Sequence, residues 1–222
     1  MDHINPSWLN RPREISIVVD NDSWILPYAM DLVCKINEAG DRANLCRHYD
    51  EISQGEVAFY LGCINITPSD IRSRNRYNLV VHESDLPNGR GFAPLTWQIL
   101  EGKNTVTACL LAAEDDVDAG PIYLRKKLCF RGDELNREIR EVQGRITVEL
   151  CMEFLESPAP LKEIPQDGEP TYYLRRRPSD SQLDVHKTIA ELFNLLRVVD
   201  NERYPAFFEI DGVRYRITIE KF

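Results

Sequence analysis

The architecture is set by residues 78–94, which read Asn-Leu-Val-Val-His-Glu-Ser-Asp-Leu-Pro-Asn-Gly-Arg-Gly-Phe-Ala-Pro. The apolar run at 79–81 predicts a buried strand that ends at His82. The prolines and glycines that follow predict a turn-rich loop with a fixed path, which suits a substrate site. In an open α/β sheet, ligands bind just outside the carboxyl ends of the strands. The sequence therefore places His82 where chemistry is expected.

The chain before this stretch alternates between strand and helix patterns. Residues 20–23 offer several side chains that can cap the first helix. This alternation predicts the α/β class, with a doubly wound and mostly parallel sheet. Strands are expected at 15–19, 43–46, 57–61 and 78–82, and helices at 25–39, 68–74 and 94–100.

The pattern changes after residue 104. Two strands at 105–112 and 122–130 flank an acidic turn, and an apolar stripe with a period near 3.6 predicts a long helix over 133–155. We expect one catalytic domain over 1–157 and a small helix-plus-β-hairpin extension over 158–222 that closes one side of the site. The extension's helix is expected at 184–199, and its hairpin at 207–219 with an Asp-Gly turn.

The composition excludes several classes of protein. A length of 222 residues with 43% hydrophobic content suits one substantial globular domain. No run of about 18 apolar residues occurs and residues 1–13 are polar, so neither a membrane span nor a signal peptide is expected. The net charge of -9 disfavours a nucleic-acid partner.

Cysteine and glycine patterns exclude further sites. The 6 cysteines are scattered without CxxC spacing, so we expect buried free thiols in a reducing cytoplasm and no metal site. No GxGxxG follows the first strand, which makes NAD or FAD a poor candidate. The arginines at 175–177 suit either a solvated turn or the recognition of a diphosphate.

Three motifs in order carry a resemblance to a known family. The loop from His82 through Leu86-Pro87, the Arg90-Gly91-x-x-Pro94 helix start, and Asp118 in an Asp-x-Gly turn resemble the folate-dependent formyltransferase superfamily. Tail segments at 177–184, 194–197 and 204–208 resemble members that act on nucleotide-linked amino sugars. Each motif alone is weak, but three in the correct order are strong. The resemblance spans about residues 57 to 210.

The resemblance implies a Rossmann-like fold and an N-formyltransferase. The implied donor is 10-formyltetrahydrofolate, and the implied acceptor is the amino group of a nucleotide sugar. The loop variant is similar to sugar-directed members of polysaccharide and pseudaminic-acid-type pathways, which favours a UDP-linked 4-amino-4,6-dideoxy sugar.

The same resemblance assigns site residues. His82 and Asp118 are the implied catalytic pair. The residues expected to bind the folate are Gly62, Cys63, Ile64, Asn65, Asp115 and Asp116. The residues expected to bind the sugar nucleotide are Glu83, Ser84, Arg90, Gly91, Asn194, Arg197 and Tyr204.

The chemistry of formyl transfer asks for the same kinds of group. Attack of an amine on a formyl carbon passes through a tetrahedral oxyanion, so it needs a base, a donor to the oxyanion and close positioning of both substrates. His82 can serve as the base. Asp118 can orient the imidazole and favour its charged form.

One position departs from the family pattern. The family carries Asn-x-His, and Val80 stands here at the place of the asparagine. Asn78 lies about 6–7 Å further along the strand, too far to replace it directly. The oxyanion donor is then the protonated His82, a backbone N–H, a bound water or Asn65.

Two other functions stay open. A methionyl-tRNA formyltransferase is disfavoured by the acidic chain and the short tail. A folate- or nucleotide-sugar-binding protein without activity would explain the missing asparagine. The terminal hairpin offers an edge strand through which a homodimer could form.

Overall fold

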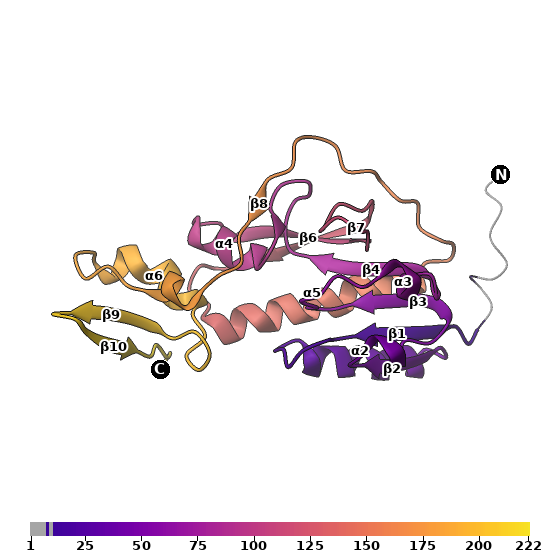
Figure 1. Ribbon diagram of the computed structural model, residues 1–222, viewed down its shortest axis with the longest axis horizontal. Coiled ribbons are helices and arrows are strands. Elements are labelled where there is room, and N and C mark those ends of the chain that lie inside the picture. Colours follow the sequence, from indigo (N-terminus) through magenta and orange to yellow (C-terminus); the bar gives the residue numbers. More distant parts are fainter. Residues whose placement is uncertain (1–7, 9–10) are drawn as a thin grey trace.

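A six-stranded sheet forms the centre of the structure, a computed structural model that describes Trp8 and residues 11–222 (Figure 1). Its strands are β1 (Glu14–Val18), β2 (Arg42–Cys46), β3 (Gly55–Tyr60), β4 (Asn75–His82), β6 (Thr105–Ala112) and β7 (Ile122–Cys129). The spatial order is β2-β1-β3-β4-β6-β7. Strands β1 to β4 run parallel, whereas β6 is antiparallel to β4 and β7 is antiparallel to β6.

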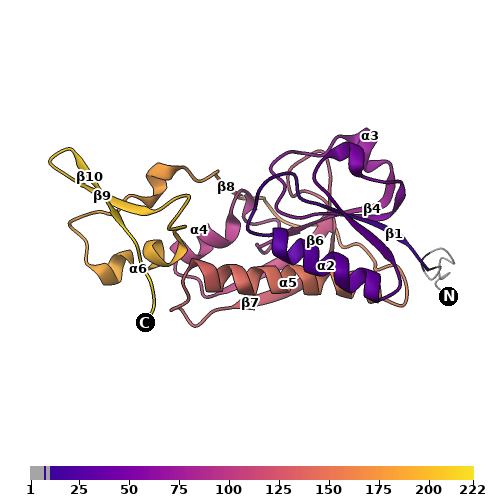
Figure 2. The ribbon, with the colours of Figure 1, turned by 90° about the horizontal axis from the view of Figure 1, so that it is seen from below.

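Two long helices cover one face of this sheet. α2 (Leu26–Glu38) and α5 (Asn136–Glu156) lie side by side and contact each other (Figure 2). The short helix α4 (Pro94–Leu100) adds two side chains to the same core, and the single turn of α3 (Ser69–Arg72) lies against β4 on the opposite face.

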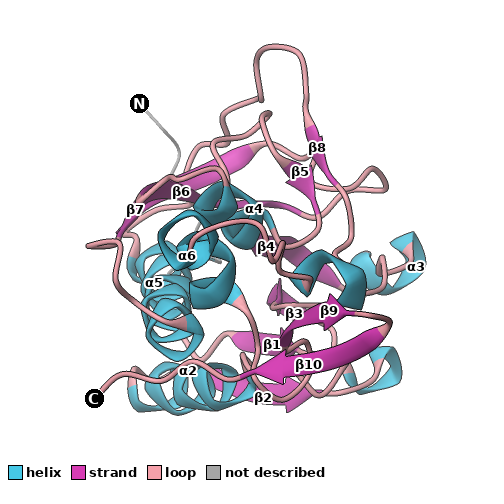
Figure 3. Cartoon of the chain, turned by 90° about the vertical axis from the view of Figure 1, so that its left-hand side faces the viewer, coloured by secondary structure: helices cyan, strands magenta, loops and turns pink. Residues whose placement is uncertain are grey.

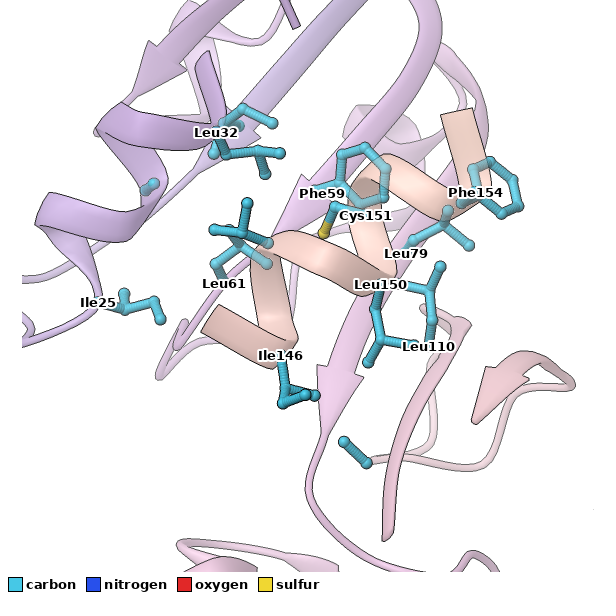
Figure 4. Close-up of a cluster of buried hydrophobic side chains, with 14 of the residues drawn as sticks. Ile25, Leu32, Phe59, Leu61, Leu79, Leu110, Ile146, Leu150, Cys151 and Phe154 are labelled. Carbon is cyan, nitrogen blue, oxygen red and sulfur yellow. The ribbon is translucent and has the colours of Figure 1, made fainter. Parts of the chain in front are cut away.

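The core follows from the two-residue repeat of the strands. Phe59 and Leu79 point toward α5, where they meet Leu150 and Phe154 (Figure 4). Alternate residues of the strands, such as Ala58, belong to a smaller apolar cluster on the other face. Burial on both faces is what a mostly parallel sheet requires.

The order of the strands creates a crevice for a ligand. β1 lies between β2 and β3, so the chain passes from β1 to its neighbour β2 on one side and then crosses to β3 on the other side of β1. Such a switch point opens a crevice outside the carboxyl ends of the strands. The segments after β1, β3 and β4, including His82, lie at this edge.

After α5 the chain arches over the sheet as an irregular segment, residues 157–171 (Figure 1). It then forms β8 (Tyr172–Tyr173), which pairs in parallel with β5 (Arg90–Gly91) in the loop after His82. We call residues 164–173 the strap, because they cross back over the loops of the site. No sequence pattern indicates this pairing.

The C-terminal extension lies at one end of the molecule (Figures 2 and 3). It contains α6 (Ile189–Val198) and the antiparallel hairpin of β9 (Ala206–Ile210) and β10 (Val213–Ile217). A small apolar cluster with Leu183, Leu196 and Ala206 holds it together. The domain boundary expected at 157/158 stays a prediction.

The α/β class, the mostly parallel sheet and the terminal hairpin are confirmed. The start of α6 is wrong by five residues, since Thr188 accepts the N–H of Glu191 at 3.3 Å and begins the helix there. Residues 20–23 do not cap α2, because Ile25 directly precedes it and no side chain caps its first turn.

The expectation of buried thiols is partly wrong. All 6 cysteines are free, but Cys34 and Cys129 are exposed. Within the described part of the chain, no helix combines the length and apolarity that crossing a membrane requires.

Candidate active site

His82 ends β4 with its ring held between two protein acceptors. Nε2 lies 2.7 Å from the carbonyl oxygen of Gly89, and Nδ1 lies 3.3 Å from Oδ2 of Asp118. Only 6% of the residue is exposed. Because a carbonyl oxygen only accepts, Nε2 carries a proton and donates it to Gly89. The expected approach of Asp118 to His82 is confirmed.

The loop after His82 fixes the carboxylate of Asp118. The backbone N–H of Gly91 donates to Oδ2 at 2.9 Å. Gly91 has φ +99°, and a Cβ there would lie 2.5 Å from the carbonyl oxygen of Tyr173. A glycine is therefore required for β5 and β8 to approach this closely. Their pairing keeps the N–H directed at the carboxylate.

The strap ties the two loops of the site together. Gln166 donates from Nε2 to the carbonyl oxygen of Asp118 at 2.7 Å, and its Oε1 accepts from Arg90 at 2.7 Å. The hydroxyl of Thr171 accepts the N–H of Gly89 at 2.8 Å. Both acceptors of the imidazole are thus positioned by residues that follow α5.

A first cavity of about 370 Å³ opens beside His82 at the carboxyl ends of β3 and β4. The loop 62–67 and the acidic turn 113–118 form much of its wall. Ile64, Ile66 and Val117 at this wall are partly exposed, at 48%, 56% and 42%. Apolar side chains beside backbone polar groups are typical of a pocket for a small organic ligand.

The loop 62–67 has a defined shape because Asp20 binds it. The carboxylate accepts the backbone N–H groups of Ile64 and Asn65 at 3.0 and 3.1 Å, and the side-chain amide of Asn65 at 2.9 Å. Burial opposes the ionisation of Asp20, but hydrogen bonds from Asn21 and this loop outweigh it and lower its pKa. An ionised carboxylate therefore organises this wall at neutral pH.

This cavity fits the folate that the resemblance implies. A pterin needs apolar contacts on its faces and several hydrogen-bond partners along its edge, which peptide groups at strand ends provide. Arg72 closes the far end, where it pairs with Asp115 and donates to the carbonyl oxygen of Thr67 at 2.6 Å. The ion pair joins α3 to the acidic turn and holds the two walls in register.

A second cavity of about 300 Å³ lies between α4, α5 and the extension. Nε of Arg176 is buried there without a hydrogen-bond partner among the described residues, although Nη2 donates to the carbonyl oxygen of Asp180 at 2.8 Å. Burial lowers the pKa of Arg176. A buried guanidinium N–H without an acceptor suits an anionic ligand. The arginines that line this cavity are Arg140, Arg175, Arg176 and Arg177.

Glu83 and Gln143 belong to the wall that both cavities share. Nε2 of Gln143 donates to Oε1 of Glu83 at 2.8 Å. Burial raises the pKa of Glu83 and outweighs the hydrogen bond from Gln143 and the attraction to His82, which both lower it. Of the residues that the structure describes, Glu83 is the one titratable side chain that lines both cavities.

The predicted folate residues gather at the first cavity with one exception. Asp115 is exposed and points to Arg72 instead. The five that line the cavity are Gly62, Cys63, Ile64, Asn65 and Asp116.

The predicted sugar residues are more scattered. Glu83 and Gly91 line the first cavity, and Glu83 and Tyr204 line the second. Ser84 is 1% exposed, and Arg90 is bound to the strap. Neither Ser84 nor Arg90 is part of the wall of these two cavities.

The substrate role expected for Arg197 and Asn194 requires correction. Arg197 is 1% exposed, its Nη2 pairs with Glu134 at 3.0 Å, and its Nη1 donates to Asn104 at 3.0 Å. These contacts commit the guanidinium to the join between α6 and the sheet. Asn194, one turn earlier on the same helix, faces Gly102 and likewise lies outside both cavities.

Neither Asn78 nor Asn65 replaces the asparagine missing at Val80. The amide of Asn78 takes part in three hydrogen bonds within the sheet region, and that of Asn65 donates to Asp20. Both amides are therefore committed elsewhere.

Sequence reasoning missed three residues that shape the site. Gln143 carries a signal, because it is polar and follows Val142 in the apolar stripe of α5. Gln166 and Thr171 carry none, since they belong to an irregular segment whose path depends on distant contacts.

No family model matches this chain. The methionyl-tRNA formyltransferase of Thermodesulfovibrio yellowstonii is 25% identical over 145 residues, which are 64% of this chain and 47% of that protein. This chain therefore spans about half the length of the curated relative that it matches.

Solved structures resemble nearly the whole chain. Methionyl-tRNA formyltransferase from Clostridium thermocellum has a TM-score of 0.80 and 22% identity, over 94% of this chain and 93% of that one. HypX from Aquifex aeolicus in complex with tetrahydrofolic acid has a TM-score of 0.72 and 16% identity, over 94% of this chain and 38% of that one. A sugar N-formyltransferase from a Shewanella species has a TM-score of 0.69 and 15% identity, over 93% of this chain and 96% of that one. This chain thus has the formyltransferase fold, and its structural neighbours include members of the formyltransferase superfamily.

Proposed function

We propose that this chain is an N-formyltransferase that moves the formyl group of 10-formyltetrahydrofolate to the amino group of a nucleotide-linked 4-amino-4,6-dideoxy sugar. The UDP-linked form is the favoured acceptor. The observation that carries the proposal is the contact of 3.3 Å between His82 and Asp118 beside the wall that separates two cavities. A neighbour named as a sugar N-formyltransferase and another named as a 4-N formyltransferase support the reaction class.

The first cavity is the proposed folate site. Its position at the strand ends, its volume and its partly apolar walls suit a pterin. The neighbour in complex with tetrahydrofolic acid supports this assignment. The folate, when bound, supplies the formyl group, and the residues of this chain orient both substrates and exclude water.

His82 and Asp118 are the proposed catalytic pair. In its doubly protonated form the ring would donate to Gly89 and also face the carboxylate of Asp118 with a positive charge. A cation at this wall stabilises the negative charge that develops on the formyl oxygen when the amine attacks. This electrostatic role accounts for a site that lacks the family asparagine at position 80.

The second cavity is the proposed site of the nucleotide sugar. Arginines bind the oxygens of a diphosphate through paired N–H groups, and Arg176 has an unused buried N–H for this purpose. The ring of Tyr204 in the same wall can pack against a nucleobase. An amino sugar attached to that diphosphate would extend toward Glu83 and the first cavity.

A methionyl-tRNA formyltransferase is the second candidate. The structure of that name from Clostridium thermocellum matches this chain over 93% of its own length. A short tail therefore does not argue against this function. The net charge of -9 does, because tRNA binding depends on basic residues that contact phosphates.

The first test is mass spectrometry of products after incubation with 10-formyltetrahydrofolate. The acceptors are UDP-linked and other nucleotide-linked amino sugars, and methionyl-tRNA in a parallel reaction. We expect a formylated sugar nucleotide, and a loss of about 10²–10³-fold in kcat/KM for His82→Ala, because the group that stabilises the oxyanion is removed. His48→Ala, an exposed histidine outside both cavities, is the matched control and should act as wild type.

The outcomes separate the candidates. A formylated tRNA, together with a gel shift that weakens steeply with salt, would favour the second candidate. Turnover on no acceptor would leave an inactive folate- or sugar-nucleotide-binding protein, which is the third reading of the sequence.

A further inference from the structure

We propose that Glu83, rather than His82, takes the proton from the attacking amine of the acceptor. The inference rests on the proposed function, because it assigns a role within the same site. The observations that carry it are the engagement of both nitrogens of His82, the place of Glu83 between the two cavities, and the support of its carboxylate by Gln143.

His82 is poorly placed to accept a proton. Nε2 already donates to the carbonyl oxygen of Gly89, and Nδ1 faces the carboxylate of Asp118. Either contact must break before the ring can receive a proton from a ligand. Thr171 and Gln166 hold the two acceptors in place, so breaking a contact would disturb the strap as well.

Glu83 lies where the amine must pass. Because the two cavities share this wall, an acceptor bound by the arginines of the second cavity would meet a formyl group in the first cavity there. Glu83 supplies the titratable group of that wall among the described residues. Its carboxylate is an acceptor for an N–H that approaches from the arginine side.

Gln143 holds that carboxylate on a rigid element. It lies in the third turn of α5, and its amide donates to Oε1 of Glu83 at 2.8 Å. The backbone N–H of Glu83 also hydrogen-bonds the carboxylate, which still has lone pairs for a substrate. A catalytic group fixed from a helix keeps its geometry better than one held by a loop alone.

The electrostatic surroundings suit a base that works near neutral pH. Burial raises the pKa of Glu83, Asp118 raises it further, and Gln143 and His82 lower it. Charged groups also face the second cavity, namely Arg140, the arginines at 175–177 and Asp200. A base with a pKa nearer the working pH accepts a proton more readily than an ordinary carboxylate.

The proton balance closes without a further reactant. As the amine nitrogen bonds to the formyl carbon, it loses one proton to Glu83. As the bond from that carbon to the folate nitrogen breaks, the folate nitrogen gains one proton. Glu83 returns its proton directly or through water, so the carboxylate is regenerated in each cycle.

The test compares Glu83→Gln with wild type on the UDP-linked 4-amino sugar, or on the panel acceptor that gives turnover. Glutamine keeps the shape and the hydrogen bond with Gln143 but cannot take the proton. We expect kcat/KM to fall by about 10²–10⁴-fold, with unchanged affinity for tetrahydrofolate in calorimetry. Glu38→Gln, an exposed change of the same kind outside both cavities, should act as wild type.

The pH profile adds a readout that a structural role would not move. In wild type the rate should rise with pH through the pKa of Glu83, and this limb should disappear in Glu83→Gln. In wild type the hydrogen bond from Gln143 lowers the pKa of Glu83. Gln143→Leu removes this bond, so the pKa should rise and the limb should shift to higher pH. Thermal unfolding should show Glu83→Gln at least as stable as wild type, since a neutral side chain replaces a charge disfavoured by burial.

The results distinguish this inference from the proposed function. If wild type turns over, Glu83→Gln is within about threefold of it and the acid limb of the pH profile is unchanged, the role of Glu83 is overturned. The proposed formyltransferase function then still stands. An absence of wild-type turnover on every acceptor would overturn both.

Discussion

At the scale of single residues, a buried ion pair between Arg13 and Asp41 fixes the start of the sheet. The two side chains are 2% exposed, and Nη2 of Arg13 lies 2.7 Å from Oδ2 of Asp41. The same guanidinium donates to the carbonyl oxygen of Leu155 at 2.9 Å, which joins β1 to the end of α5. Burial opposes the charge on Asp41, but the hydrogen bonds from Arg13 outweigh it and lower the pKa.

This pair predicts a defined loss of stability in acid. A carboxyl whose folded pKa lies below the ordinary 3.8 stabilises the fold above that value, and the contribution is lost as the pH falls through the folded pKa. Asp41→Asn should cost about 3–5 kcal/mol at neutral pH, because it leaves Arg13 buried without a counter-charge. The free energy of unfolding, measured with urea from pH 7 down to acid, should depend less on pH in this variant than in wild type.

A matched control is Asp31→Asn, since Asp31 is half exposed and its pair with Lys35 lies on the surface of α2. Such pairs contribute about 0–1 kcal/mol. Parallel stability curves for wild type and Asp41→Asn across the acid range would contradict the prediction.

At the scale of elements, α2 and α5 are in contact at Gly144. A Cβ at this position would lie 2.5 Å from the ring of Tyr28 on α2. The glycine therefore allows the tyrosine to pack directly on the backbone of α5. The same contact helps to hold the turn of α5 that carries Gln143.

We expect Gly144→Ala to destabilise the protein by about 1–3 kcal/mol through overpacking. In a Tyr28→Ala background the same change should cost much less, or gain stability, because the ring is gone and alanine favours helix. A double-mutant cycle by chemical denaturation measures the coupling. Equal costs in both backgrounds would show that the ring is not the obstacle.

The elements show which parts of the site a sequence can predict. The strand to His82 and the turn with Asp118 were predictable, because the apolar pattern and the motif are local. The contacts of Gln166 were not, because the strap has no periodic pattern and pairs with residues far away in the chain. The sequence around Arg197 resembles a binding motif and therefore predicts a substrate contact, whereas the burial of this side chain depends on how α6 packs.

At the scale of the whole molecule, Arg197 joins the extension to the sheet. Its guanidinium contacts Glu134 before α5 and Asn104 before β6, so one side chain of α6 links three parts of the chain. The extension forms part of the arginine-lined cavity through Tyr204. The second cavity therefore depends on this join.

We expect Arg197→Met to cost about 3–5 kcal/mol, because it leaves Glu134 buried without its partner. The KM for the acceptor should rise as the second cavity loosens, while tetrahydrofolate affinity stays the same in calorimetry. Arg214→Met, an exposed arginine of the hairpin, is the control. A normal stability with a raised acceptor KM would instead restore the substrate role that the sequence suggested.

The strap makes the completion of the site a late event in the life of the chain. When the ribosome has synthesised the chain to the end of α5, all strands of the sheet, His82 and Asp118 are already present in the nascent chain. The groups that aim both of them, Gln166 and Thr171, emerge afterwards. Nascent chains that end at the expected boundary near residue 157 would thus carry every proposed catalytic side chain but lack the two residues that position them.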